Sequence, residues 1–431
     1  MENSLTNSER RVGIISWALY DWANSAFATV VLAGFFPIFF KQFWAPQFDT
    51  TESTFLLGTA NSIASLSIVL IAPLVGAMAD HLERRKAFLM TFTALGVVMT
   101  GGLYWAGEGE WFLAILLFVG GFLGFAGGNL FYDSLLAFVA KPEHLDRVSA
   151  LGFGLGYLGG GLLFSINIWM TLSPETFHFA DKTEAVRFSF LCVAVWWALF
   201  AIPLFLFVSE PRKKKRQFSK KSLSGGFRQL IQTYHQARAL KHTFLFLLAY
   251  WLYIDGVDTI IRMAVDFGMS IGFKPESLII ALLITQFVGF PAAIFYGYLG
   301  EKIGAKSGIL VAIVIYIGIT IYATQMDKAW EFYFLAIMIG LVQGGIQSLS
   351  RSLYTRIIPK HQTAEFFGFY NMMGKFAAVI GPFFVGWLTI ITNSNRIGLL
   401  AVVVLLVLGG MLFWRVDVEQ AEKAVQNDLE K

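Results

Sequence analysis

Four charged residues interrupt an otherwise apolar stretch, WLYIDGVDTIIRMAVDFG, at positions 251–268. They are Asp255, Asp258, Arg262 and Asp266, and each is three or four residues from the next. On an α-helix this spacing places all four along one face, with the arginine between acids. Acids in such a setting can bind a cation or a proton, and a guanidinium can bind an anionic group. A structural ion-pair network is the alternative interpretation, and the spacing is compatible with both.

Another acid, Asp21, lies in a similar apolar stretch, LYDWANSAF, near the start of the sequence. When Asp21 is set against Asp255, Asn24 falls on Asp258, so the two stretches share a polar pattern. Polar faces inside a membrane turn towards one another or towards water, and away from lipid. We therefore expect Asp21 and Asp255 to face each other across a central cavity, with Asp266 at its rim.

Three more polar residues are predicted to line the same cavity. Lys375 lies deep in the apolar stretch YNMMGKFAAVIGP, where it can neutralise an acid or bind a carboxylate. Asn129 and Gln347 lie in two further apolar stretches. These side chains offer both signs of charge, which suits a zwitterion: an acid for its amine, and Arg262 or Lys375 for its carboxylate.

The composition indicates which elements must hold these residues. Of the 431 residues, 56% are hydrophobic and 14% are charged, whereas soluble domains contain about 25% charged residues. Apolar runs of about 18 residues or more, long enough to cross a bilayer, recur from Val12 to Trp414. We predict an all-α membrane protein with twelve transmembrane helices. Their expected ranges are about 12–41, 53–79, 87–106, 111–139, 147–171, 186–208, 242–268, 276–299, 307–325, 331–356, 363–392 and 397–415.

The distribution of basic residues predicts how these helices are oriented. Of the 33 lysines and arginines, 25 fall in the two termini, the central loop and the connections on the same side. Because basic residues are retained on the cytoplasmic side, both termini are predicted to be cytoplasmic. The central loop, residues 211–242, is rich in lysine and arginine, which favours contact with anionic lipid over binding to nucleic acid.

A loop motif occurs twice, once after the second predicted helix and once after the eighth. The first copy, GAMADHLERRKAF, contains Gly76, Asp80, Arg84 and Arg85. The second copy, GYLGEKIGAKSGI, contains Gly297, Glu301, Lys302 and Lys306. In each copy the glycine permits close helix packing, the acid can cap a neighbouring helix, and the basic residues can pair with acids. We predict that these loops form a cytoplasmic gate.

This repeated loop, in a protein of six plus six helices, resembles the major facilitator superfamily over essentially the whole sequence. The resemblance implies two pseudo-symmetric six-helix bundles, at residues 1–208 and 242–416. A basic linker that can carry an interfacial helix, residues 209–241, would join them, and residues 417–431 would form a charged tail. One departure is Glu83, where the superfamily motif usually has glycine.

The repeat extends to the fourth and tenth predicted helices. A shift of 218 residues aligns Asp133 with Arg351, and both lie near the predicted cytoplasmic ends of their helices. We therefore expect both residues to belong to the gate, with Asp133 facing Arg84 or Arg85 and Arg351 facing Glu301. A role in substrate binding is the alternative for this pair.

Three short stretches narrow the resemblance. LYDWANSAF, YWLYIDGVDTII and GFGLGYLGGG are similar to the unknown major facilitator family, bacterial relatives of the yeast vacuolar amino-acid effluxers. This second resemblance implies solute export, with amino acids as one precedent. In the third stretch, Gly152, Gly156 and Gly160 form a ladder that lets another helix approach closely.

The predicted function is secondary active transport by alternating access, namely proton-coupled export of a small polar or zwitterionic solute such as an amino acid. A sugar, drug or siderophore carrier, or a uniporter, is the alternative on the same fold. A non-transporting membrane receptor or scaffold is the alternative of another class. The sequence contains no ATP-binding loop, catalytic triad or metal-ligand cluster, so no enzyme activity, cofactor or metal is expected. We expect a monomer in a bacterial inner membrane.

Overall fold

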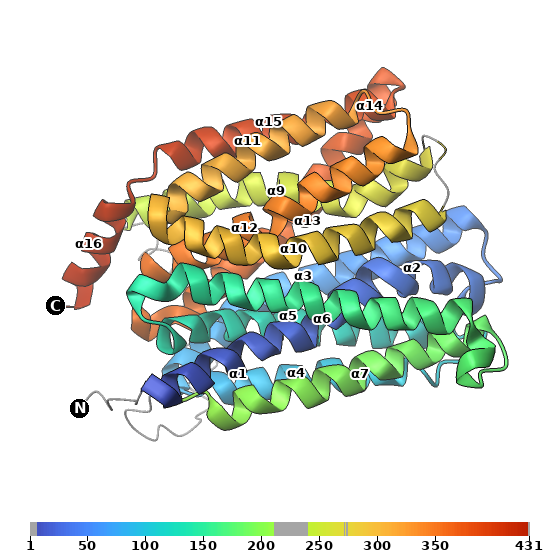
Figure 1. Ribbon diagram of the computed structural model, residues 1–431, viewed down its shortest axis with the longest axis horizontal. Coiled ribbons are helices and arrows are strands. Elements are labelled where there is room, and N and C mark those ends of the chain that lie inside the picture. Colours follow the sequence, from blue (N-terminus) through green and yellow to red (C-terminus); the bar gives the residue numbers. More distant parts are fainter. Residues whose placement is uncertain (1–6, 211–239, 271, 273–274, 430–431) are drawn as a thin grey trace.

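The computed structural model describes residues 7–210, 240–270, 272 and 275–429. For a few residues inside helices, including Arg262 and Asp266, only the backbone is described. All regular elements in these ranges are helices, and the long ones run side by side (Figure 1).

The helices fall into two groups in chain order. The first group contains α1 (Asn7–Ala26), the π-helix η1 (Phe27–Phe35), α2 (Phe36–Phe39), the π-helix η2 (Phe40–Trp44), α3 (Thr50–Leu82), α4 (Arg85–Gly102), α5 (Trp111–Val139), α6 (Leu145–Leu172) and α7 (Lys182–Phe207). The second group contains α9 (Lys241–Ser270), α10 (Pro275–Ile303), α11 (Ala305–Ala323), α12 (Ala329–Arg356), α13 (Thr363–Thr392), α14 (Asn395–Gly398), α15 (Leu400–Trp414) and α16 (Val418–Leu429). Short 3-10 turns, η3 (Pro142–His144), η4 (Pro174–Phe177) and η5 (Lys360–Gln362), lie between long helices.

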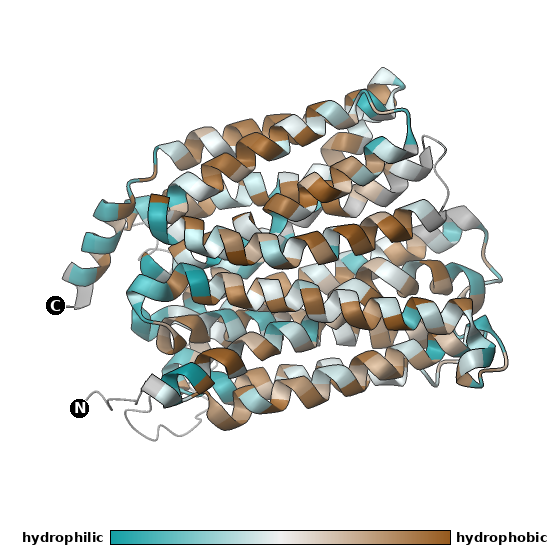
Figure 2. Ribbon diagram, in the orientation of Figure 1, coloured by the Kyte–Doolittle hydropathy of each residue, from teal (hydrophilic) through white to brown (hydrophobic). Residues whose placement is uncertain are grey.

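Most of these helices are suited to a membrane. Eleven segments in the described part are long and apolar enough to cross one, the first being Ser8–Trp44, which runs from α1 through η2. The remaining long helix, α4, packs against α5 and α7 within the bundle, in agreement with the twelve predicted crossings. Apolar residues cover the middle of the helices and polar residues gather at the two ends of the bundle (Figure 2). We call the end where α1 begins and α15 ends the terminal end (Figure 1).

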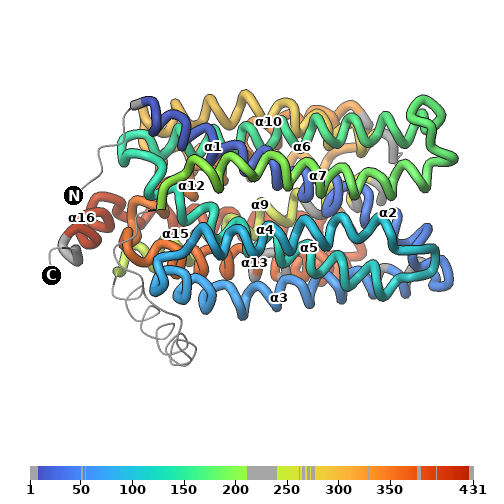
Figure 3. Tube along the Cα trace, turned by 90° about the horizontal axis from the view of Figure 1, so that it is seen from below, coloured from blue at the N-terminus to red at the C-terminus, as the bar shows by residue number. Residues whose placement is uncertain are grey.

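The two groups have separate hydrophobic cores. The first core includes Trp17, Phe131 and Trp197, and the second includes Tyr253 and Phe413. Two pairs of neighbours join the groups along their length, α6 with α10 and α3 with α13 (Figure 3). Helices α12 and α5 add contacts to α6 and α13, respectively. Relative movement of the groups must therefore take place along these few helices.

The turns that follow α3 and α10 both contain a residue with a positive φ, but their ψ angles differ, at 45° for Glu83 and 143° for Gly304. Glu83 ends α3 in the left-handed conformation, with φ 51° and ψ 45°, and Gly304 follows α10 with φ 84°. A positive φ is disfavoured for residues other than glycine because the Cβ approaches the backbone. Glu83 therefore adopts a backbone conformation that glycine adopts more readily.

Candidate functional site

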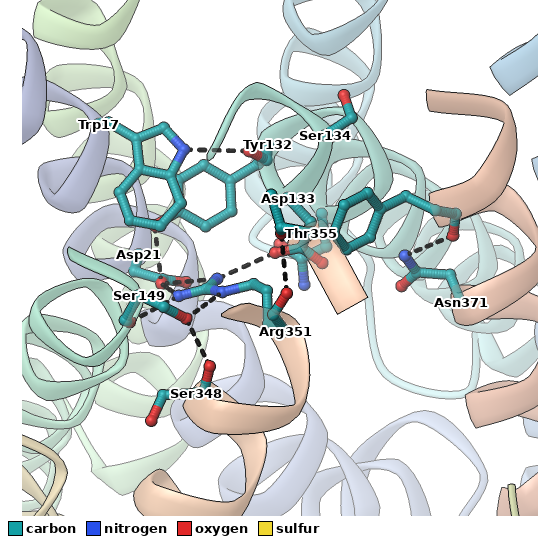
Figure 4. A network of polar contacts seen from close by, with 12 residues as sticks. Trp17, Asp21, Tyr132, Asp133, Ser134, Ser149, Ser348, Arg351, Thr355 and Asn371 are labelled. Carbon is teal, nitrogen blue, oxygen red and sulfur yellow. Dashed lines mark hydrogen bonds and ion pairs between the residues drawn. The ribbon is translucent and has the colours of Figure 1, made fainter. Parts of the chain in front are cut away.

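Arg351 on α12 lies at the centre of a polar network (Figure 4), with only 2% of its surface exposed. Its Nε donates to Ser149 Oγ at 2.9 Å, and its Nη2 donates to the Ser149 carbonyl at 2.8 Å. Its Nη1 donates to Asp133 Oδ1 at 2.9 Å, and the two terminal nitrogens reach Asp21 Oδ2 at 3.3 and 3.4 Å. All five N–H groups of the guanidinium therefore have acceptors.

Aromatic side chains enclose the guanidinium. The rings of Trp17, Tyr132 and Phe153 have centroids 4.9, 5.3 and 4.2 Å from its carbon. Tyr132 Oη also donates to Asp21 Oδ2 at 2.8 Å, and Trp17 Nε1 donates to the Tyr132 carbonyl at 3.0 Å. The faces of these rings favour a cation, so the network stabilises Arg351 in this position.

The network joins the two groups near the terminal end. Asp21, Asp133 and Ser149 belong to α1, α5 and α6 of the first group, whereas Arg351 belongs to the second. Ser149 Oγ also donates to the carbonyl of Ser348 on α12, at 2.8 Å. We call Arg351, Asp21, Asp133 and Ser149 the inter-group latch.

The predicted partners of the latch residues are wrong. Asp133 does not face Arg84 or Arg85, and Arg351 does not face Glu301, because Asp133 and Arg351 bind each other. Equivalent positions of two repeated bundles meet when they lie close to the axis that relates the bundles. The 218-residue shift aligns the two residues, but an alignment alone does not show that the aligned positions contact each other.

The first loop motif contacts the start of α13. Asp80 Oδ2 accepts a hydrogen bond of 2.8 Å from the backbone N–H of Glu365, in the first turn of that helix, and Asp80 also pairs with Arg85 at 2.5 Å. A Cβ placed on Gly76 would lie 2.9 Å from the carbonyl carbon of Ala364, so only glycine allows this approach. The expected helix capping and close packing are both confirmed. Arg84 is exposed.

The second loop motif contacts the start of α6, but the contacts of its acid are with side chains and not with a backbone N–H. Glu301 lies 3.6 Å from Arg147 and 3.4 Å from His144. A Cβ on Gly297 would lie 2.6 Å from the Cβ of Ala150, so these helices also pack closely. Lys302 is exposed. Each loop therefore contacts a helix of the opposite group.

Some residues of this end were missed by the sequence interpretation. Asp146 is fully buried at the start of α6, where its carboxylate accepts from Ser352 Oγ at 2.5 Å and from Arg356 Nη2 at 2.8 Å. Asp146 lies in the polar stretch KPEHLDR, which is typical of a loop, so no spacing marks it. Only the position of α12 in the structure shows that Asp146 joins α6 to α12.

Asp255 has a different environment from Asp21. Its Oδ1 accepts from the backbone N–H of Gly381 on α13 at 2.9 Å and from Thr259 Oγ1 at 3.4 Å, and the residue is 1% exposed. Asp21 instead binds Arg351 and Tyr132, so the contacts described for the two acids are with different residues. Asp255 therefore fixes α13 beside α9.

The remaining predicted cavity residues are placed as follows. The amides of Asn24 and Asn129 hydrogen-bond to each other, and Tyr157 Oη donates to Gln347 Oε1 at 3.2 Å across the two groups. Lys375 Nζ lies 5.2 Å from the centroid of the Phe122 ring, also across the groups. Asp258 is half-buried on α9. The side chains of Arg262 and Asp266 lie outside the described residues.

The glycine ladder of α6 faces α1 and η1, so a neighbouring helix approaches it closely, as the spacing predicts. A Cβ on Gly156 would meet Ser25 Oγ at 2.5 Å, and one on Gly160 would meet Thr29 Oγ1 at 2.6 Å. A Cβ on Gly152 would lie 2.7 Å from Asp21 Oδ2 and 3.0 Å from an Arg351 nitrogen. The ladder therefore leaves the space in which Arg351 reaches Asp21.

Comparison with solved structures defines the fold class of the protein. The chain matches the human organic anion transporter MFSD10 (TETRAN) with a TM-score of 0.72 and 13% identity, covering 95% of this chain and 100% of that one. It matches XylE, a proton:xylose symporter of the major facilitator superfamily, with a TM-score of 0.69 and 14% identity, covering 95% of each chain. At these identities the likeness establishes the fold, which is that of the major facilitator superfamily.

Sequence relatives narrow this class. The family model "Vacuole effluxer Atg22 like" matches residues 45–426. The chain is 37% identical over 422 residues to the uncharacterized MFS-type transporter YxiO of Bacillus subtilis (strain 168), covering 96% of this chain and 97% of that protein. It is 25% identical over 330 residues to Autophagy-related protein 22 of Yarrowia lipolytica (strain CLIB 122 / E 150), covering 68% of this chain and 55% of that protein.

The chain belongs to the Atg22-like family of the major facilitator superfamily. It is a multi-pass membrane protein of a family of transporters rather than enzymes. Both resemblances inferred from the sequence are thereby confirmed.

Proposed function

We propose that this protein is a secondary active transporter that exports a small polar or zwitterionic solute, such as an amino acid, in exchange for protons. It would work by alternating access in a bacterial inner membrane, as a monomer with both termini in the cytoplasm. Most of the basic linker, residues 211–239, lies outside the described residues, and we retain anionic lipid as its proposed partner. The name of the matching family, vacuole effluxer, supports export.

The inter-group latch is the observation that carries this proposal. Arg351 of the second group is buried among α1, α5 and α6 of the first, so the groups are closed at the terminal end. Alternating access requires a closed arrangement at one end that can exchange with an open one. A contact made of a few ion pairs and hydrogen bonds suits this exchange, because water can replace each bond when the groups separate.

Polar groups in the interior support a small polar solute. Asn24, Asn129, Tyr157 and Gln347 offer neutral hydrogen-bonding groups, and Asp258 and Lys375 offer both signs of charge. We assign an amine of the solute to the acid and its carboxylate to the lysine. A strongly charged site disfavours sugars, whereas a drug or siderophore carrier, or a uniporter, remains the alternative on this fold.

A flux measurement tests the proposal. The purified protein is placed in liposomes, and uptake of each of the twenty protein amino acids is measured one at a time, with and without a pH gradient. We expect at least one amino acid to be carried, and its flux to increase with the gradient. Flux that ignores the gradient would indicate a uniporter.

A non-transporting receptor or scaffold makes the opposite prediction. A receptor or scaffold would carry none of the amino acids. The variants Asp21→Asn and Asp255→Asn would leave its receptor or scaffold activity intact. Loss of flux in either variant, in protein that retains its thermal stability, would exclude this alternative.

A further inference from the structure

The inter-group latch contains two acids and one base. Asp21 and Asp133 are both 8% exposed, and Arg351 is 2% exposed. With both acids ionised the cluster carries one excess negative charge. An uncompensated charge in an apolar interior is costly, and such groups lose the charge by binding or releasing a proton.

In the described part of the chain, the contacts of the two acids include no base besides Arg351. From α5, Tyr132 is a neutral donor to Asp21; from α6, Ser149 contacts Arg351, while Asp146 is already paired with Arg356 of α12. From α1, Tyr20 hydrogen-bonds to Thr93, and from α13, Asn371 is neutral. The ammonium of Lys375, on α13, lies over the Phe122 ring, and Asp258, on α9, is half-buried.

We propose that the latch is the proton-binding site of the transport cycle, with one proton held by the Asp21–Asp133 pair while the groups are closed. The proton makes the cluster neutral: two acids, one guanidinium and one proton. This inference rests on the proposed function, and it places the coupling proton at the gate rather than at Asp255, whose carboxylate binds the α13 backbone.

The positions of the three residues explain how binding would couple to movement. Both acids belong to the first group and the base belongs to the second, so opening the terminal end separates them. The two acids then become hydrated, and a hydrated carboxylic acid releases its proton at neutral pH. The proton is taken up when the latch closes and leaves towards the terminal end when it opens. A solute exported in the other half of the cycle would cross the membrane in the direction opposite to that of the proton.

Infrared spectroscopy of the full-length protein in lipid detects the proton directly, because a protonated carboxylic acid has a C=O stretch that a carboxylate lacks. At neutral pH we expect such a band, and we expect Asp21→Asn and Asp133→Asn each to abolish it. Asp327→Asn is the matched control: its exposed acid pairs with Arg396 at the opposite end, so the band should persist. If one variant fails to fold, the other still shows whether the band belongs to the Asp21–Asp133 pair, because each variant removes one of the two acids.

The distance between the groups provides a second measurement. Spin labels on cysteines at the exposed positions Glu143 and Lys360, with Cys192→Ser, report opening of the terminal end. A single coupled proton should change the ratio of closed to open molecules by about tenfold per pH unit, with opening favoured as pH rises. Asp21→Asn and Asp133→Asn should remove this dependence, and Asp327→Asn should retain it.

Different results would overturn different proposals. A carboxylic acid band and a pH-dependent distance that both persist in Asp21→Asn and Asp133→Asn would overturn the proton site. Exchange of a labelled amino acid for the same unlabelled one needs no pH gradient, so it tests transport alone. If that exchange continues while the proton site fails, transport stands; if the exchange is absent for every amino acid while the band behaves as expected, the proposed solute class fails.

Discussion

At the scale of single residues, Arg351 illustrates how much depends on a partner that is distant in sequence. The residue types were informative, because charged side chains in apolar stretches had to find polar surroundings. The pairing of Asp133 with Arg351 was not predictable. The two residues are separated by 218 positions, and their contact depends on how the two groups of helices dock. Capping of α13 by Asp80 was predictable, because the acid follows directly from the loop motif.

Removal of the guanidinium should destabilise the closed arrangement strongly. In Arg351→Met the two acids lose their base, and breaking a buried ion pair by removing one partner costs about 3–5 kcal/mol. We expect a lower melting temperature in detergent at neutral pH, measured by intrinsic fluorescence.

The control for this change is Arg396→Met. Arg396 pairs with the exposed Asp327 and donates to the Thr324 and Met326 carbonyls at the opposite end of the bundle. An exposed ion pair contributes about 0–1 kcal/mol to stability. The melting temperature of Arg396→Met should therefore fall much less than that of Arg351→Met. Equal losses in the two variants would contradict the assignment of the latch.

At the scale of elements, the helices were largely predictable and their local shapes were not. The predicted range 363–392 coincides with α13, since a long apolar run between polar loops leaves little choice. The π-helical turns at Phe27–Phe35 and Phe40–Trp44 were not predicted, because an apolar run looks the same in either kind of helix. Chain geometry of this kind is decided by packing against neighbouring helices.

Opposite effects on stability are expected at the two loop turns. Glu83→Gly removes a left-handed conformation that costs a residue with a Cβ about 1–2 kcal/mol. Gly304→Ala introduces a backbone cost at the equivalent turn, where φ is 84° and ψ is 143°, close to a region that is essentially restricted to glycine. Thermal melting should therefore rise for the first variant and fall for the second. A fall for both would show that the Glu83 side chain stabilises the turn by more than its backbone costs.

A methyl group in the glycine ladder should disturb the latch. In Gly152→Ala the new Cβ would lie 2.7 Å from Asp21 Oδ2 and Tyr132 Oη, so Asp21 must move away from Arg351. We expect the spin-label distance to shift towards the open arrangement. In Gly58→Ala, on α3, the new methyl group meets nothing within 4 Å, so this variant should behave like the wild type.

At the scale of the whole molecule, two rigid groups move against each other only if nothing ties them together. We expect a disulfide between Ala150→Cys and Gly297→Cys, with Cys192→Ser, to stop amino-acid exchange, because it joins α6 to α10. The Cβ positions are 2.6 Å apart, so a small shift allows the usual disulfide separation of about 3.5–4.5 Å. Exchange should return when a reducing agent is added.

A disulfide inside one group is the matched control. Gly101→Cys and Ala194→Cys, in the same background, place the Cβ atoms 3.3 Å apart on α4 and α7, both of the first group. Oxidation of this pair should leave exchange unchanged. Loss of exchange with both disulfides would indicate that movements inside a group are also required.

The pairing of Asp133 with Arg351 has a consequence for the ancestry of the chain. Internal repeats of this kind arise when a gene for one bundle is duplicated and fused. Had the bundle worked as a symmetric dimer, the residue at this position would have met its own copy: aspartate against aspartate, or arginine against arginine. Two arginines repel, and two aspartates repel unless they share a proton. The attractive contact became available only after the two copies could mutate independently within one gene, so fusion would have preceded the ion pair that now closes the protein.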